Sequence, residues 1–330
     1  QIYATPADYC TMGCRFVEDL FDRLERIEEG AYGVVYRARC VESGKYVALK
    51  RLKLEREREG FPTTSLREIS SLANLKHENV ISLHEVVVSR DNLLEVYLVM
   101  EYAEYDLKEM LDDGKFRATL CSVPVVKRIV FDLLTAIAYM HEKWYVHRDL
   151  KLTNLLLCLA DKKIKVADFG LTRKIGDPQT GRLTESVVTL WYRAPELLLG
   201  STKYGPAIDV WSVGCVMGEL ITGKPLFPGR GEIDQLDQII QILGMPTVKI
   251  WPGLKDLPHF GKLRSGDGVV NEYNMLDRLL NSYTSPLGLD LVDRLLTYDP
   301  EKRITAREAL KHAYFTEQPG PVDSLECLFR

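Results

Sequence analysis

The fold is decided by three motifs that follow one another from His147 to Glu196: HRDLKLTN at 147–154, DFG at 168–170 and APE at 194–196. Taken alone, a DFG triplet is a turn in most proteins and an HRD triplet is an ordinary surface segment. Their order and spacing favour a site for phosphoryl transfer, a reaction in which the protein mainly positions the reactants and neutralises charge.

Four side chains of this stretch have predicted roles. Asp149 accepts or orients the proton of a substrate hydroxyl, and Lys151 stabilises the charge of the transferred phosphoryl group. Asn154 and Asp168 offer oxygen atoms, which Mg²⁺ prefers as ligands. The stretch therefore predicts ATP and Mg²⁺ as cofactors.

Upstream of these motifs, GAYGVV at 30–35 lies between two predicted strands. Glycine lets a backbone approach phosphate groups closely, although a hairpin is the simpler explanation of this segment alone. Lys50 ends an apolar strand, where it either extends to solvent or binds the α- and β-phosphates while Glu68 orients it. On that second interpretation, Lys50 and Glu68 join the catalytic residues.

The pattern up to residue 102 is mostly strand-like. Runs at 34–39 and 46–52 are rich in β-branched and aromatic residues and are joined by the hairpin signal ESGK, and 96–102 is a third apolar run. One helix interrupts them: Ser65 and Glu68 form a capping-box pattern shortly after a proline, which predicts that the helix begins there.

After residue 102 the pattern becomes helical. Apolar residues recur at helical spacing between Ile129 and Met140, and 208–222 is apolar nearly all round, which predicts a helix buried on every side. We therefore predict a two-lobed α+β fold. Its parts are a flexible lead-in (1–16), a small β-rich lobe (17–102), a larger helical lobe (103–316) and a C-terminal tail (317–330).

Composition excludes several classes of protein. The chain has 330 residues, of which 46% are apolar and 27% charged, as in ordinary globular proteins. Its net charge of −4 argues against direct binding of nucleic acid, and no apolar run approaches a membrane span. Seven scattered cysteines favour reduced thiols over a disulfide framework or a zinc site. The first residue is Gln1, so we expect a piece of a longer or trimmed chain.

Two further segments resemble a known family. VVTLWYRAPE at 187–196 and FPTTSLRE at 61–68 are similar to segments of the cyclin-dependent kinases, and the second is most similar to their PITSLRE-type branch. RIEEG at 26–30 and EREGFP at 57–62 point the same way. The resemblance covers about residues 20–316 and implies the eukaryotic protein kinase fold and serine/threonine kinase activity.

The resemblance also implies a nucleotide site. Met100 matches the gatekeeper, Glu101 and Ala103 match the hinge whose backbone pairs with adenine, and Asp106 matches a ribose contact. Glu28 stands where the general kinase pattern has glycine, and the resemblance makes it a feature of this branch. The apolar roof and floor and the other implied nucleotide contacts are Ala48, Leu156, Ile27, Glu28, Glu29, Gly30, Ala31, Tyr32, Gly33, Val35, Lys50, Asn154 and Asp168.

Regulation by phosphate is implied at two positions. Thr184 matches a threonine that is phosphorylated in the resembling kinases, and Arg67, Arg148 and Arg173 match the arginines that bind this phosphate. A phosphate adds negative charge that pairs with guanidinium groups and orders a loop. Tyr32 matches a site of inhibitory phosphorylation.

Substrate and partner are implied in the same way. Val187, Val188 and Arg193 match the pocket that favours proline after the phosphorylated residue, so we expect Ser/Thr-Pro protein substrates. The helix that contains Glu68 matches the face on which a cyclin docks, and the branch suggests an L-type cyclin. The branch also suggests work in the nucleus, in transcription, RNA processing or cell-cycle control, with the cytoplasm as the alternative.

A scaffold is the alternative from another class: a pseudokinase that binds a cyclin-like partner without catalysis. The presence of Lys50, Glu68, Asp149, Asn154 and Asp168 argues against it.

Two further matches are structural. The resemblance implies that Glu196 pairs with Arg303, and that Asp209 begins the buried helix and braces the catalytic loop. Residues 229–247 resemble the insert of this kinase group, which is either a docking surface or a solvated loop and helix.

Overall fold

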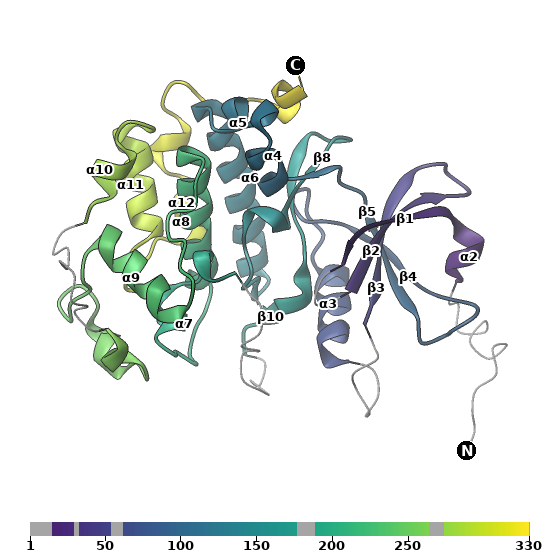
Figure 1. Cartoon of the computed structure of the whole chain (residues 1–330), viewed down its shortest axis with the longest axis horizontal. Coiled ribbons are helices and arrows are strands. Elements are labelled where there is room, and N and C mark those ends of the chain that lie inside the picture. Colours follow the sequence, from purple (N-terminus) through teal and green to yellow (C-terminus); the bar gives the residue numbers. More distant parts are fainter. Residues whose placement is uncertain (1–14, 30–32, 54–61, 177–188, 264–273, 330) are drawn as a thin grey trace. The chain divides into compact units, whose positions relative to one another are not determined.

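A computed structural model describes residues 15–29, 33–53, 62–176, 189–263 and 274–329, except for the side chains of residues 23 and 28. The chain divides into two compact units (Figure 1). The first comprises residues up to Glu104 together with Phe169–Leu171, and the second comprises Tyr105–Asp168 and the residues from Thr172 onward. The lobe boundary predicted at 102/103 is two residues from the boundary between the units at 104/105.

The first unit is built on a five-stranded antiparallel sheet with the strand order β1-β2-β3-β5-β4. The strands and helices of this unit are α2 (Val17–Leu20), β1 (Phe21–Glu29), β2 (Gly33–Cys40), β3 (Tyr46–Leu52), α3 (Thr63–Asn74), β4 (Leu83–Val88) and β5 (Val96–Glu101). The predicted hairpin at 42–45 joins β2 to β3, and Gly44 has the positive φ of 68° that such a turn requires.

The residues before β1 belong to the core of the first unit. Val17 is buried in one cluster with Phe21 at the start of β1 and with residues of β2, β3, β4 and β5. Arg15 accepts a backbone bond from Val88 of β4 at 3.2 Å, and its guanidinium pairs with Glu85 at 2.6 Å. The lead-in predicted for 1–16 therefore already contacts the sheet at Arg15, while residues 1–14 lie outside the described residues.

The helix α3 begins earlier than the capping-box pattern predicts. Its N-terminal flanking residue is Pro62, which provides no side-chain cap, and Ser65 and Glu68 lie inside the helix. The capping-box prediction is therefore wrong. Glu68 is buried instead of returning to the helix end, because its carboxylate has a partner on β3.

The second unit is mainly helical and carries two small sheets. Its helices are α4 (Leu107–Asp112), α5 (Gly114–Leu120), α6 (Val123–Glu142), α7 (Pro195–Leu198), α8 (Ala207–Thr222), α9 (Glu232–Leu243), α10 (Leu276–Leu280), α11 (Pro286–Leu295) and α12 (Ala306–Ala309). One sheet has the order β6-β8-β9, and the other pairs β10 with β7. These strands are β6 (Tyr105–Asp106), β7 (Tyr145–Val146), β8 (Leu155–Cys158), β9 (Lys163–Val166) and β10 (Arg173–Lys174).

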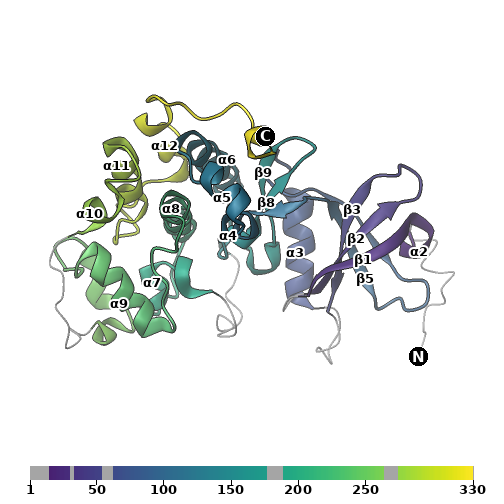
Figure 2. The same cartoon turned by 45° about the horizontal axis from the view of Figure 1, so that its top comes forward.

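The long helix α8 lies among the other helices of this unit, against α6 and α11 (Figure 2). Every residue from Ile208 to Ile221 is buried, so the predicted all-round burial is confirmed. Gly218 has no room for a side chain, because an added Cβ would lie 2.1 Å from Leu226. The apolar face predicted between Ile129 and Met140 is also confirmed, on α6.

A strand-rich unit followed by a helical unit confirms the α+β prediction. None of the helices in the described ranges is long and apolar enough to cross a bilayer. The five cysteines of the described residues form no disulfide.

Candidate active site

The catalytic loop between β7 and β8 places two of the predicted side chains beside the carboxylate of a third. Asp149 is buried, and its Oδ2 accepts bonds from Lys151 Nζ at 2.8 Å and Asn154 Nδ2 at 3.1 Å. Asn154 Nδ2 also donates to the backbone oxygen of Asp149 at 2.7 Å. Both contacts to the carboxylate use Oδ2, so Oδ1 accepts none of the hydrogen bonds made among the described residues.

The ring of His147 contacts the backbone of two segments. Its Nδ1 accepts the N–H of Asp149 at 3.3 Å, and its Nε2 lies 3.0 Å from the oxygen of Ala167. An acceptor at Nδ1 and a carbonyl beside Nε2 assign the ring proton to Nε2. His147 thus joins the loop to the segment that leads into Asp168.

Asp209 braces the same loop from inside α8, as the resemblance implied. Its carboxylate accepts the N–H groups of His147 at 2.9 Å and Arg148 at 2.8 Å, and it lies 3.0 Å from His141 Nε2. Burial alone would raise the pKa of Asp209, but the bonds and charge of these partners lower the pKa below its ordinary value. The loop is therefore anchored to the most deeply buried helix of the unit.

Two residues of this region hold unusual backbone conformations. Arg148 has φ 73° and Asp168 has φ 58°, in the left-handed region that side chains other than glycine rarely adopt. Such strain persists only where surrounding contacts enforce it. At Arg148, the bond from its N–H to Asp209 supplies one such contact.

Lys50 and Glu68 form an ion pair within the first unit. Lys50 Nζ lies 2.6 Å from Glu68 Oε1, and both side chains are buried. Burial removes the interpretation in which Lys50 extends to solvent. Phe169 of the first unit is also fully buried, in a short helical turn packed against α3.

The residues matched to the adenine site are placed as follows. Ala48 is opposite Met100 in the β3–β5 ladder, so the predicted roof and gatekeeper are neighbours. The N–H of Glu101 donates to Ser82 at 2.9 Å. Within the described part of the chain, no hydrogen bond uses the backbone of Ala103.

Asp106 has a structural role that the sequence did not predict. Its Oδ1 accepts the N–H groups of Lys108 at 2.8 Å and Glu109 at 2.9 Å, which caps the N-terminus of α4. Asp106 is opposite Leu156 in the β6–β8 ladder, so the predicted ribose contact and apolar floor are neighbours in the second unit.

The glycine-containing segment is described only in part. Gly30, Ala31 and Tyr32 lie outside the described residues. Gly33 pairs with β3, and an added Cβ would lie 2.4 Å from the oxygen of Arg51, so close strand packing alone requires glycine there.

The remaining predicted nucleotide contacts lie on β1 and β2. Ile27 is exposed, Glu29 pairs with Lys53 at 3.3 Å, and Val35 is opposite Lys50 in the β2–β3 ladder. The backbone of Glu28 is opposite Val35.

A hollow beside Asp149 is lined by Arg148, Thr189, Tyr192 and Arg193. Burial lowers the pKa of the Arg193 guanidinium, while the carboxylates of Glu232 and Asp149 act in the opposite direction. Val187 and Val188, the other two residues predicted to contact substrate, lie outside the described residues.

The wall of this hollow rests on a buried carboxylate. The hydroxyl of Tyr192 donates to Glu219 Oε2 at 2.6 Å. Burial and the neighbouring Glu219 carboxylate raise the pKa of Tyr192 far above its ordinary value, so this hydroxyl remains a donor at any physiological pH.

The predicted regulatory residues are divided between the units. Arg67 lies on α3 in the first unit and is partly buried. In the second unit, Arg173 is opposite Val146 on the strand that leads into Arg148. The guanidinium of Arg148 donates to the hydroxyl of Tyr204. Thr184 lies outside the described residues, as does Tyr32.

The pairing of Glu196 with Arg303, which the resemblance implied, is confirmed by the geometry. Arg303 forms a two-bond ion pair with Glu196, at 2.8 and 3.0 Å, and both residues are buried.

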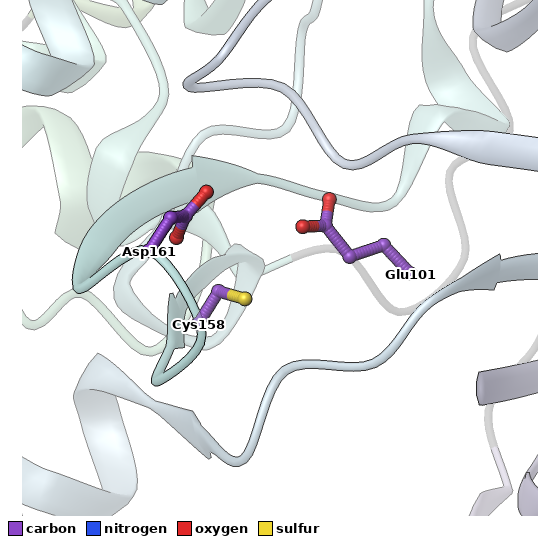
Figure 3. Close-up of side chains that lie close together, drawn as sticks. All are labelled: Glu101, Cys158 and Asp161. Atoms are coloured by element: carbon purple, nitrogen blue, oxygen red, sulfur yellow. The ribbon is translucent and has the colours of Figure 1, made fainter. Parts of the chain in front are cut away.

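Figure 3 shows Cys158 at the end of β8, Asp161 on the following turn, and Glu101 at the end of β5. Glu101 belongs to the first unit and the other two to the second, so no site is assigned to the three; Asp161 pairs with Lys165 at 2.8 Å.

A family model described as the protein kinase domain matches residues 21–315. The chain belongs to the protein kinase domain family. This kinase domain has the strand-rich and helical units expected of that fold, so the fold prediction is confirmed.

Its curated relatives also confirm the branch. The domain is 48% identical over 311 residues to a mouse protein named Cyclin-dependent kinase 11B, covering 94% of this chain and 38% of the relative. It is 47% identical over 311 residues to a rat protein of the same name, covering 94% and 69%. It is 49% identical over 314 residues to Serine/threonine-protein kinase PITSLRE of Drosophila melanogaster, covering 94% and 32%. The chain thus spans well under half the length of the mouse and fly relatives.

Sequence reasoning missed three residues of this kinase domain. His141 contacts the bracing Asp209, Tyr204 contacts Arg148, and Glu219 supports Tyr192. The partners in these pairs are 27 to 68 positions apart, so no local spacing predicts them.

Proposed function

We propose that this kinase domain transfers the γ-phosphoryl group of ATP to serine and threonine hydroxyls of proteins. The observation that carries the proposal is the arrangement around Asp149. A buried carboxylate is held by Lys151 and Asn154 through one oxygen, and its other oxygen accepts no bond among the described residues. Such a carboxylate can accept a proton from a substrate hydroxyl.

Mg²⁺ would be held by Asn154 and Asp168. Both side-chain bonds of Asn154 use Nδ2, so its Oδ1 suits a cation that prefers oxygen ligands. When bound, the ion supplies positive charge that neutralises the phosphate oxygens. The Lys50 ammonium, oriented by Glu68, would add charge at the α- and β-phosphates.

In the reaction, Asp149 takes the proton of the attacking hydroxyl. A bond forms between the substrate oxygen and the γ-phosphorus, the bond from that phosphorus to the bridging oxygen breaks, and ADP leaves. Lys151, 2.8 Å from Asp149, would stabilise the charge on the transferred group. Asp209 contributes by holding the loop backbone and makes no contact with the reactants.

A transfer assay with labelled ATP tests the proposal, using the domain together with a cyclin. We expect phosphate transfer to a protein substrate, and a loss of roughly 10²- to 10⁴-fold in Asp149→Asn, because the proton acceptor is removed. The pseudokinase scaffold is the alternative. A wild-type domain that binds cyclin and ATP but transfers no phosphate would support the scaffold and end the proposal.

We infer that the substrates carry proline after the phosphorylated residue. Arg193 lines the hollow beside Asp149, which suits a residue that helps to form the binding site for the following position. Proline suits a site that leaves the substrate N–H without a partner. A matched pair of peptides, Ser-Pro and Ser-Ala, tests this: equal kcat/KM for the two would contradict it.

A cyclin, of the L type on the basis of resemblance, is the proposed activating partner. Leu66 lies on α3 two residues before Glu68 and is 52% exposed, so an apolar side chain is available beside the catalytic pair. Binding there would bias the position of Glu68. Full activity of the domain without a cyclin would count against this.

Three further elements of the proposal rest on the resemblance. Phosphorylation of Thr184 activates the enzyme, phosphorylation of Tyr32 inhibits it, and the enzyme works in the nucleus. If Thr184→Ala kept its activity with cyclin, activation through Thr184 would be ruled out. If mass spectrometry found no phosphate on Tyr32, inhibition through Tyr32 would be ruled out. A full-length fluorescent fusion confined to the cytoplasm would remove the third.

A further inference from the structure

Lys127 on α6 is the most deeply buried cation among the described residues, with none of its surface exposed. Its Nζ donates to the backbone oxygens of Glu317 at 3.1 Å and Pro319 at 2.8 Å, and it lies 3.3 Å from Glu317 Oε1. It also lies over the ring of Tyr314, 4.6 Å from its centre. A buried ammonium is tolerated only with such partners, so Lys127 binds the segment that begins at Glu317 firmly to α6.

We call Glu317–Phe329 the C-terminal strap. After Pro319 the strap is bound along its length to other parts of the second unit. Val322 donates to Pro124 at 3.2 Å, and Arg128 donates to Asp323 at 3.2 Å. The strap therefore runs along the start of α6.

Further along, the strap reaches the turn between β8 and β9. Glu326 pairs with Lys162 at 2.9 Å, and the N–H of Leu325 donates to the oxygen of Lys162 at 3.4 Å. Leu325 and Leu328 are buried. Buried leucines and paired backbone groups distinguish this segment from a solvated tail.

The strap ends in a cluster of three aromatic rings. The ring of Phe329 lies 5.5 Å from that of Tyr105 and 5.6 Å from that of Phe116, and Tyr105 and Phe116 are 5.8 Å apart. Rings at these separations and tilts attract one another beyond the area that they bury.

Tyr105 connects this cluster to the nucleotide residues of the second unit. It is the first residue of β6 and is followed by Asp106, which we assigned to the ribose. Asp106 is opposite Leu156 in the ladder, and its Oδ1 is used by the cap of α4. Asp106 thus lies where β6 meets α4, and a shift of β6 would also shift its Oδ2.

We propose that the C-terminal strap is a positioning element for the nucleotide: through Phe329 and Tyr105, it holds β6 so that Asp106 can accept hydrogen bonds from the ribose hydroxyls. This inference rests on the proposed ATP binding. Phe329 and Tyr105 act through Asp106 and make no contact with the nucleotide in this proposal. The simpler alternative is that the strap only covers apolar surface.

Binding of two nucleotides separates these explanations. Calorimetry of the 330-residue chain with ATP and with 2′,3′-dideoxy-ATP compares ligands that differ only in the ribose hydroxyls. We expect Phe329→Ala to weaken ATP binding about fivefold and to leave dideoxy-ATP binding unchanged, with faster amide exchange at 105–107. A fivefold change corresponds to about 1 kcal/mol, the net contribution of a typical hydrogen bond.

Phe131→Ala is the matched control. Phe131 is 37% exposed against 39% for Phe329, and it also makes an edge contact with one ring, that of Phe315 at 5.4 Å. We expect no change for either nucleotide in this variant, and we expect Phe329→Leu to restore part of the ATP affinity. Thermal unfolding of all variants checks that each is folded.

The outcomes distinguish this inference from the proposed function. Equal weakening of both nucleotides, an unchanged affinity for ATP, or the same effect in Phe131→Ala overturns the strap as a positioning element and leaves the proposed function intact. A wild-type chain that binds no ATP overturns the proposed function, and this inference with it.

Discussion

Two buried ion pairs, one in each unit, differ in what surrounds them. Lys50 and Glu68 join a strand to α3 in the first unit, whereas Arg303 and Glu196 join the segment before α12 to α7 in the second. All four side chains are nearly inaccessible to solvent, so burial does not separate the pairs. Arg303 has further acceptors, the backbone oxygens of Thr297, Tyr298 and Ala207.

The helices beside the two pairs differ more strongly. The buried residues of α3 are Ser65, Glu68, Ser71 and Leu72, which include only one large apolar side chain. The helix α8 is buried from Ile208 to Ile221 and carries Trp211 in its middle. Since apolar burial is the main force that holds a helix in place, α3 is held much less firmly than α8.

The firm attachment of α8 and the weaker attachment of α3 give the two groups of predicted catalytic residues different roles. Asp209 holds the loop that contains Asp149, and it lies on a helix that cannot move unless the unit unfolds. The geometry of this loop is therefore set when the unit folds. The Lys50–Glu68 pair depends on a helix with a shallow apolar anchor and an exposed Leu66. A regulatory partner can act on the second kind of element at low energetic cost, but not on the first.

The largest effect is expected from Glu196→Ala, which leaves the Arg303 guanidinium buried without its carboxylate. We expect the free energy of unfolding to fall by about 3–5 kcal/mol, measured by denaturant titration. Glu142→Ala is the control: it removes an exposed ion pair with Arg307, and we expect a change below about 1 kcal/mol. Equal effects of the two variants would show that the pair at Arg303 does not hold this region.

Asp209→Asn should have the next largest effect. The shape is kept, but one acceptor oxygen is replaced by an NH₂ group that faces donors from the loop backbone. We expect a loss of about 1–3 kcal/mol in the free energy of unfolding, together with a lower kcat. An active enzyme with normal kcat and normal stability would contradict the assignment of Asp209 as the brace.

Glu68→Ala should cost less stability than Glu196→Ala, although both remove one acid from a buried pair. Because α3 can shift and let water reach Lys50, we expect the free energy of unfolding to fall by about 1 kcal/mol. This is the loss expected for an ion pair in contact with solvent. Activity should fall about 100-fold, since Lys50 is no longer oriented. A fall of 3 kcal/mol or more in the free energy of unfolding would show that α3 is held as firmly as α8, which would contradict the difference between the two units.

The smallest effect is the pH dependence of the brace. The pKa of Asp209 lies below its ordinary value of 3.8, so its stabilisation is complete above that value and is lost as the pH falls through the lowered pKa. The difference in unfolding free energy between wild type and Asp209→Asn should therefore be constant from about pH 7 to about pH 5 and should shrink below about pH 4. A difference that stays constant at the lower pH as well would indicate that the carboxylate charge plays no part.

Local pattern predicted the parts of the fold that depend on local sequence. The apolar run at 208–222 predicted α8, and ESGK predicted the turn between β2 and β3. The motifs around Asp149 predicted residues that the structure brings together, because they lie within six positions of one another.

Other features could not be predicted, because each is decided by a distant partner. The local sequence around Glu68 fits a capping box, but in the structure Glu68 pairs with the buried ammonium of Lys50, 18 positions away. Asp106 was assigned to a ligand and missed as a helix cap. Lys127 gives no local sign that its partners lie about 190 positions further along the chain.

The family match, from 21 to 315, is shorter than the unit that folds. The core of the first unit includes Val17, and the buried ammonium of Lys127 depends on Glu317 and Pro319. A recombinant protein that begins at residue 21 and ends at residue 315 would expose apolar surface at its N-terminal end. At its C-terminal end, it would leave the buried ammonium of Lys127 without its partners. For expression and crystallisation, the boundaries of this kinase domain should enclose at least residues 15–329.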